Sequence, residues 1–187
     1  MIRYIEEYRK YVEITGYMEI SFAEAEAFLK ANRKQAHQHV EIQFFDAELI
    51  ATSEHLYFAV LNALQAFLQK TNISKSIAME TMLYASAQSQ IQKSIDILGI
   101  KKTTKNMAVT IIGSDPKQIE NALQGLTSCI GRNSDETVLQ MSKHKQENIK
   151  QAFSITNEEL HSLTKDDIET AIVDLVIERV ALLATAL

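Results

Sequence analysis

The spacing of apolar and polar residues predicts three strands. Residues 11–17 alternate apolar and polar side chains up to Gly16, which is typical of a half-buried strand, and residues 40–45 predict a second strand. Residues 107–112 form an almost unbroken apolar run, as expected for a well-buried strand. We therefore expect a small, antiparallel sheet.

Helical spacing of apolar residues fills most of the remaining chain. The segment 77–84 is apolar all round, so we expect it to be central in the fold. Capping residues mark several boundaries: Ser74 or Ser76 can begin that helix, Asp115 followed by Pro116 begins another, and Gly99 follows the end of a third. The predicted helices cover about 22–32, 53–70, 77–84, 89–98, 116–129, 148–155, 157–163 and 165–187.

The order of these elements predicts the fold class. A strand, a helix, a strand, several helices, a strand and further helices give an α/β (α+β) fold, with the small sheet surrounded by helices. At 187 residues, 46% hydrophobic and 23% charged, the chain has ordinary globular composition. We expect one domain over residues 1–187.

Composition also indicates the cellular compartment of the protein. The single cysteine, Cys129, excludes an internal disulfide framework, and charges interrupt the first ten residues before a signal segment could form. No uninterrupted apolar run approaches the length of a membrane span. We expect a cytoplasmic protein that does not contact membranes.

Charge is unevenly distributed along the chain. The whole sequence carries a net charge of -5, but residues 70–105 hold six lysines and two acidic residues, a net of +4. Such a basic segment on an acidic body can meet a few phosphates. The alternative is a solvated face that has no partner.

Candidate catalytic and metal-binding residues are few and isolated. His37 and His39 have the spacing of two zinc ligands on one side of a strand, yet no third ligand accompanies them. His55 could act as a general base with Glu54 or Glu80, but packing or capping explains it more simply. We assign no catalytic residue, no metal site and no cofactor.

The last predicted helix has an apolar surface wider than one face. Core packing explains most of this excess, and an exposed part could dock a partner protein. The predicted interface residues on this helix are Ile172, Val176, Val180 and Leu183.

Several short strings, in order along residues 40–183, resemble one family. It is the family of small accessory subunits of the KEOPS (EKC) tRNA-modification complex, the PRPK-binding proteins. The strings are Gln43-Phe-Phe-Asp-Ala47, Ile50-Ala-Thr-Ser-Glu-His55 with Ala63, Asn72-Ile-Ser-Lys-Ser76, Met79-Glu80, Leu83-Tyr-Ala-Ser86, Gln90-Ile91, Leu98-Gly-Ile100 and Glu178-Arg-Val-Ala-Leu182.

The resemblance implies a non-enzymatic subunit without a cofactor. Its complex makes threonylcarbamoyladenosine (t6A) beside the anticodon of tRNAs, and other subunits perform the chemistry. The subunit binds and stimulates the small atypical kinase of the complex and helps to recruit tRNA by its single-stranded 3′ CCA end. The alternative is a protein-interaction scaffold that holds the kinase without contacting RNA.

The segment 71–91 is the predicted RNA contact. Lys75 can neutralise a phosphate, and Ile73 offers apolar contact to an unstacked base. The N-terminus of the following helix could present backbone N–H groups to an anion. The predicted tRNA-binding residues are Asn72, Ile73, Ser74, Lys75, Ser76 and Lys93.

The chain departs from the family pattern in this segment. Many members have Gly and Arg where this sequence has Ala87 and Ser89. Alanine adopts positive φ angles only at a cost, and serine carries no charge. We therefore expect weaker tRNA binding than in members with that arginine, unless Lys93 replaces it.

Overall fold

The computed structural model describes residues 1–34, 40–163 and 167–185, with only the backbone for residues 32–34. The strands are β1 (Arg3–Ile5), β2 (Lys10–Tyr17), β3 (Val40–Asp46) and β4 (Met107–Gly113). The α-helices are α1 (Phe22–Lys34), α2 (Ser53–Gln69), α3 (Ile77–Ala85), α4 (Ile91–Leu98), α5 (Pro116–Ile130), α6 (Lys143–Ala152), α7 (Asn157–Ser162) and α8 (Ile168–Thr185). Three short 3-10 helices are η1 (Glu6–Tyr8), η2 (Ala47–Leu49) and η3 (Glu136–Leu139).

The four strands form one antiparallel sheet in the order β1-β2-β4-β3. Both β2 and β3 pair antiparallel with β4, so they run parallel to each other on its two sides. This confirms the small antiparallel sheet and the α+β class. The edge strand β1 was not predicted, because its three residues are too few to establish an alternating pattern.

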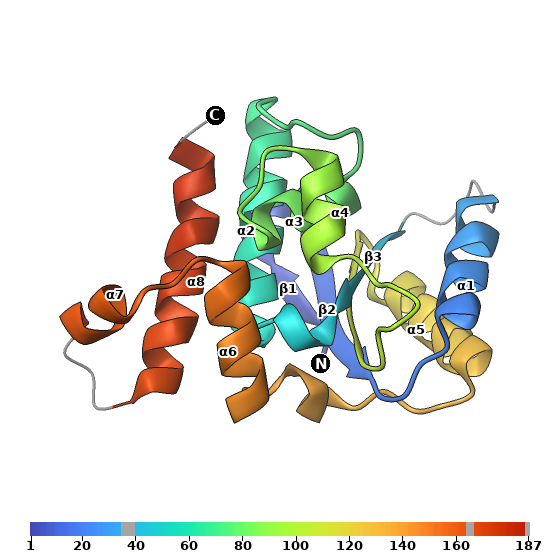
Figure 1. Cartoon of the computed structure of the whole chain (residues 1–187). Coiled ribbons are helices and arrows are strands. Elements are labelled where there is room, and N and C mark those ends of the chain that lie inside the picture. The colour runs from blue at the N-terminus through green and yellow to red at the C-terminus, as the bar shows by residue number, and fades with distance from the viewer. Residues whose placement is uncertain (35–39, 164–166, 186–187) are drawn as a thin grey trace.

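Helices cover both faces of the sheet (Figure 1). Helices α1 and α5 pack on one face, around Phe44, Val109 and Ile111. Helices α2 and α3 pack on the opposite face, around Phe45 and Ala108, and α8 packs against both of them. Helix α6 in turn contacts α8 and η2. The apolar helix α3 is therefore central, as predicted.

Capping residues begin the helices close to where the sequence places them. The Ser76 hydroxyl accepts from Met79 N at the start of α3, and Asp115 accepts from Lys117 N before Pro116 in α5. Gly99 follows α4 as predicted, but its φ is -68°, so it is not a left-handed cap. A Cβ atom at position 99 would lie 2.5 Å from Ile95 O, which is too close, so this position requires glycine.

Two helix starts differ from the prediction or lie outside the described residues. Helix α6 begins at Lys143 rather than near residue 148, because Ser142 accepts from Lys145 N and caps an additional turn. The predicted start of the last helix at 164–166 and its end at 186–187 lie outside the described residues, as do His37 and His39. Within those residues α8 runs from Ile168 to Thr185.

The predicted interface residues of α8 are core residues in this structure. Ile172, Val176 and Val180 are 0% exposed, and Leu183 is 8% exposed. They pack with α2, α3 and α6, so the wide apolar surface of α8 is used within the chain. Burial removes these four side chains from the surface that a partner could touch.

Candidate functional site

The buried side chain of Glu80 holds the backbone of residues 70–76, the segment between α2 and α3. Its side chain is 0% exposed, and its two carboxylate oxygens accept from Ile73 N at 3.1 Å and Ser74 N at 2.7 Å. A carboxylate that accepts two backbone N–H groups fixes the path of that backbone. The backbone of this segment therefore has a defined conformation at Ile73 and Ser74.

A second carboxylate occupies the N-terminus of α3. Glu41 Oε2, from β3, accepts from Ala78 N at 3.0 Å, while Ser76 Oγ accepts from Met79 N. These two N–H groups would otherwise remain without a partner inside the helix. The expectation that this helix start offers free N–H groups to a phosphate is therefore wrong for these two donors.

Three side chains predicted to contact RNA, those of Asn72, Ser74 and Ser76, bond to the backbone of this chain instead. Asn72 Nδ2 donates to Ser74 O, and Ser74 Oγ donates to Ser76 O, with Ser74 only 3% exposed. The side chains that remain displayed are Ile73, which is 39% exposed, and Lys75. The apolar and cationic parts of the prediction thus lie on the surface, and much of its hydrogen-bonding part does not.

The segment after α3 ends the helix with a strained residue. Ala87 N donates to Tyr84 O and Gln88 N donates to Leu83 O, which is the Schellman arrangement. Ala87 occupies its left-handed position with a φ of 52°. Glycine takes this conformation at low cost and alanine does not, so the turn is strained at this residue.

Lys93 and Ser89 lie on the surface beside this turn. Lys93 is exposed in the first turn of α4, and Ser89 is exposed just before that helix. Figure 1 shows the start of α4 at the same end of the molecule as the segment between α2 and α3. Ile91 and Ile95 of α4 are also partly exposed, at 42% and 37%.

His55 connects the start of α2 to the end of α3. Its Nδ1 accepts from Ala51 N at 3.2 Å, so the proton lies on Nε2, which donates to Ala85 O at 2.8 Å. Complete burial lowers the pKa of His55 to about 4, although the bond to Ala85 O opposes this. With both ring nitrogens bonded to backbone, His55 packs and joins elements, and it has no nitrogen free for a substrate.

Lys145 is a buried cation that the sequence did not distinguish. Its Nζ donates to Val138 O at 3.0 Å and Gln140 O at 3.2 Å, and the residue is 4% exposed. Burial lowers the pKa of Lys145 to about 8, while the nearby carboxylates of Glu48 and Asp46 raise it. Lys145 therefore anchors α6 to the segment around η3.

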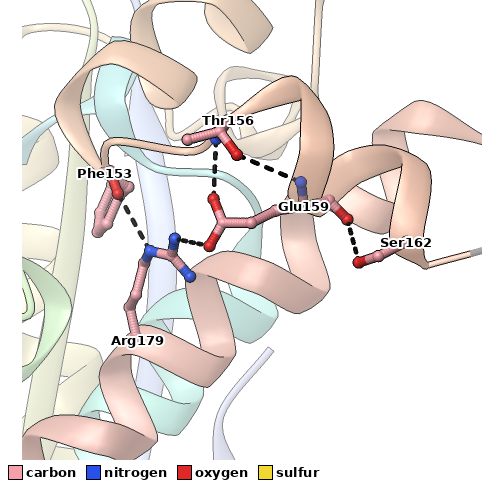
Figure 2. Close-up of polar contacts among 5 residues, drawn as sticks. All are labelled: Phe153, Thr156, Glu159, Ser162 and Arg179. Carbon is pink, nitrogen blue, oxygen red and sulfur yellow. Dashed lines mark hydrogen bonds and ion pairs between the residues drawn. The ribbon is translucent and has the colours of Figure 1, made fainter.

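Arg179 holds α7 and the end of α6 against α8 (Figure 2). Its Nε donates to Phe153 O at 3.1 Å, and one terminal nitrogen pairs with Glu159 Oε1 at 2.6 Å. The other oxygen of Glu159 accepts from Thr156 N, and Glu159 N donates to Thr156 Oγ1. The capping box of α7 is thereby joined to α8 through one arginine.

The exposed side of α2 is the feature that the sequence reading missed. From His55 to Gln69 the helix contains no Asp, Glu, Lys or Arg. Phe58 is 40% exposed and Leu68 is 63% exposed. Leu61 is at helical spacing with both and is half-buried, because it also packs against the core cluster around Ile5 and Val60. We call Phe58, Leu61 and Leu68 the α2 face. The absence of charge over four turns was the signal for it.

A cavity of about 610 Å³ opens elsewhere, where the start of α2 meets the sheet edge and the segment around η3. Its lining includes Arg3, Glu54, Glu136 and Glu169. None of the residues predicted from the sequence to bind tRNA or a kinase lines it. Within the described part of the chain, no three His, Cys, Asp or Glu residues are grouped so as to hold a metal ion.

Comparison with known proteins identifies the family. A family model described as kinase binding protein CGI-121 matches residues 22–184, which is most of the chain. The chain belongs to the CGI-121 family. A relative from Methanocaldococcus jannaschii, named regulatory protein Cgi121, is 31% identical over 116 residues, covering 62% of this chain and 72% of the relative.

The CGI-121 match confirms the family resemblance found in the sequence. It spans α1 through α8, so the central helix α3, the α2 face and Arg179 all lie within it. Of the helices that the structure describes, none is long and apolar enough to cross a membrane.

Proposed function

We propose that this chain is a non-catalytic subunit of the KEOPS complex that binds and stimulates the small atypical kinase of that complex. The observation that carries the proposal is the match of residues 22–184 to a family described as kinase binding protein. The name of the M. jannaschii relative, a regulatory protein, supports a role exercised on another protein. We expect this role to be cytoplasmic.

The α2 face is the kinase-docking surface in this proposal. Partner-binding surfaces are depleted of charge at their centre and enriched in aromatic side chains, and Phe58, within the charge-free stretch from His55 to Gln69, fits that description. The α8 residues named from the sequence contribute indirectly, because they hold α8 against α2.

Exchange of Phe58 tests the docking surface. Phe58→Glu places a charge on the α2 face, so we expect at least a tenfold weaker interaction with the kinase subunit and a matching loss of stimulated ATPase activity. Ile168→Glu is the matched control, since Ile168 is 59% exposed and belongs to a different helix, α8. Equal binding by both variants would remove the α2 face from the proposal.

The second part of the proposal is recognition of the tRNA 3′ CCA end during t6A synthesis. Support comes from the displayed pair Ile73 and Lys75, which offers an apolar contact and a cation on a backbone fixed by Glu80. Lys93 adds a cation at the start of α4. Asn72, Ser74 and Ser76 contribute by shaping the segment.

Trimmed tRNA tests the RNA contact. In a titration followed by electrophoretic shift, we expect tRNA without its CCA end to bind much more weakly than intact tRNA. Lys75→Glu should reproduce this loss and Ser89→Arg should strengthen binding, because each changes the charge met by phosphates. Lys117→Glu on α5 is the control for net charge. Equal binding of intact and trimmed tRNA would favour the alternative, a kinase scaffold without RNA contact.

A further inference from the structure

A rigid turn between α4 and β4 displays three lysines. Lys101, Lys102 and Lys105 are exposed, whereas Thr104 between them is 6% exposed. Thr104 Oγ1 donates to Asp46 Oδ2 at 2.7 Å and accepts from Lys101 N at 2.9 Å. Thr104 N also donates to Lys101 O, which closes the turn. One buried threonine therefore fixes the backbone that carries all three cations.

The carboxylates beside this turn already have partners. Asp46 accepts from Thr104 and also from Glu48 N, while Glu48 accepts from Asn106 Nδ2. Within residues 1–34, 40–163 and 167–185, none of the three lysines forms an ion pair with a carboxylate. The positive charge of the turn is thus directed to solvent.

The turn lies at the opposite end of α4 from the segment that carries Ile73 and Lys75 (Figure 1). Helix α4 has eight residues, so its axis rises about 12 Å. Cations therefore occur at both ends of α4, with Lys93 in its first turn and the three lysines after its last. This arrangement suits an extended polyanion better than a single phosphate.

We infer that the lysine turn, Lys101, Lys102 and Lys105, contacts backbone phosphates of the base-paired acceptor stem next to the CCA end. This inference rests on the proposed tRNA binding. The side chains between the lysines are Thr103 and the buried Thr104, so the turn offers no aromatic group on which an unpaired base could stack. A turn that presents only cations contacts phosphates without reading sequence.

The test replaces all three lysines by glutamine in the full chain. Binding of intact tRNA and of a short single-stranded RNA ending in CCA is measured over a range of salt concentrations. We expect the variant to bind tRNA about tenfold more weakly, with the slope of log K against log salt reduced by about 2, and to bind the short RNA like the wild type. The control exchanges Lys30, Lys117 and Lys143 for glutamine.

The outcomes separate this inference from the function on which it rests. If the wild type prefers intact to trimmed tRNA but the variant keeps the wild-type tRNA affinity and salt slope, the inference is wrong and the proposed RNA binding stands. An equal loss for tRNA and the short RNA also overturns it, as does a loss of kinase binding with tRNA binding unchanged. If the wild type does not distinguish intact from trimmed tRNA, the proposed RNA function itself fails.

Discussion

At the scale of single residues, His55 makes stability depend on pH. Its Nδ1 accepts from Ala51 N, so protonation would break that bond and place a charge in a site that is 0% exposed. Burial lowers its pKa to about 4 in the folded state, whereas an unfolded chain protonates histidine near pH 6.5. Between these values the unfolded state binds the additional proton, so stability rises with pH there.

Unfolding measurements at different pH values test this effect. We predict that the free energy of unfolding attributable to His55 falls by about 3 kcal/mol as the pH drops from about 6.5 to 4. Urea titrations between pH 4.5 and 7 would measure it. His55→Gln keeps one backbone bond but cannot titrate, so its pH dependence should be flatter in this window. Parallel pH profiles for the two proteins would contradict the assignment.

Ala87 carries strain that a single exchange should release. Its φ of 52° costs an L-residue about 1 kcal/mol more than glycine. Ala87→Gly should therefore raise the free energy of unfolding by about 1 kcal/mol. Ala27→Gly, at an exposed position inside α1, is the control and should lower it by about the same amount. Thermal unfolding of both variants measures the difference, and destabilisation by Ala87→Gly would disprove the strain.

At this scale the sequence predicted the roles of single residues better than their hydrogen-bond partners. Packing of His55 and the cap at Ser76 follow from local chemistry, whereas the cost at Ala87 was expected from the resemblance to proteins with glycine there. The bonds from Ile73 and Ser74 to Glu80 were not predicted, because the carboxylate reaches back from α3 over the preceding segment. Occupation of the α3 start by Glu41 depends on how β3 lies beside α3, which local spacing does not specify.

At the scale of elements, strong apolar periodicity predicted most helices and strands, and weak periodicity caused the errors. Strand β1 has three residues, and α6 opens with the polar sequence Lys-His-Lys-Gln-Glu-Asn before its apolar residues. Its first turn is stabilised by the Ser142 cap and by burial of Lys145 against carbonyls. Such tertiary contacts override local propensity.

Arg179 should control how firmly α7 is held. Arg179→Met removes the bond to Phe153 O and the pair with Glu159 but keeps much of the side-chain volume. We predict that amide hydrogens of α7 then exchange several-fold faster, while those of the central strand β4 are unchanged. Hydrogen exchange measured by mass spectrometry would test this.

A double-mutant cycle separates the ion pair from general loosening. Glu159→Gln combined with Arg179→Met should show a coupling of about 1 kcal/mol, because both partners are partly exposed. Additive effects would mean that the two residues stabilise the chain independently.

At the scale of the whole molecule, the sequence could not assign the apolar surfaces to the core or to a partner. The apolar excess of α8 predicted an interface, but Val176 and Val180 are buried by neighbouring helices. Exposed apolar side chains occur on several helices, including Phe58 and Leu68 of α2 and Ile168 near the start of α8. Periodicity identifies an apolar face, and only the packing of all helices determines which faces remain uncovered.

The surfaces proposed for the kinase and for the tRNA are different parts of one chain. In the proposed function the kinase contacts the α2 face, and the RNA contacts the segment of Ile73 and Lys75 together with the lysine turn. Both partners should then bind at once. Leu68 lies in the last turn of α2 and close in sequence to this segment, so Phe58 is the better residue for separating the two functions.

The most direct test is an electrophoretic shift of labelled intact tRNA with this chain and the kinase subunit together. We predict a further shift when the kinase is added, which reports a complex of all three. Phe58→Glu should abolish only that further shift, whereas Lys75→Glu should weaken the shift by the chain itself and leave its kinase binding intact. Release of tRNA when the kinase is added, or no shift of tRNA by the chain at any concentration tested, would contradict the account.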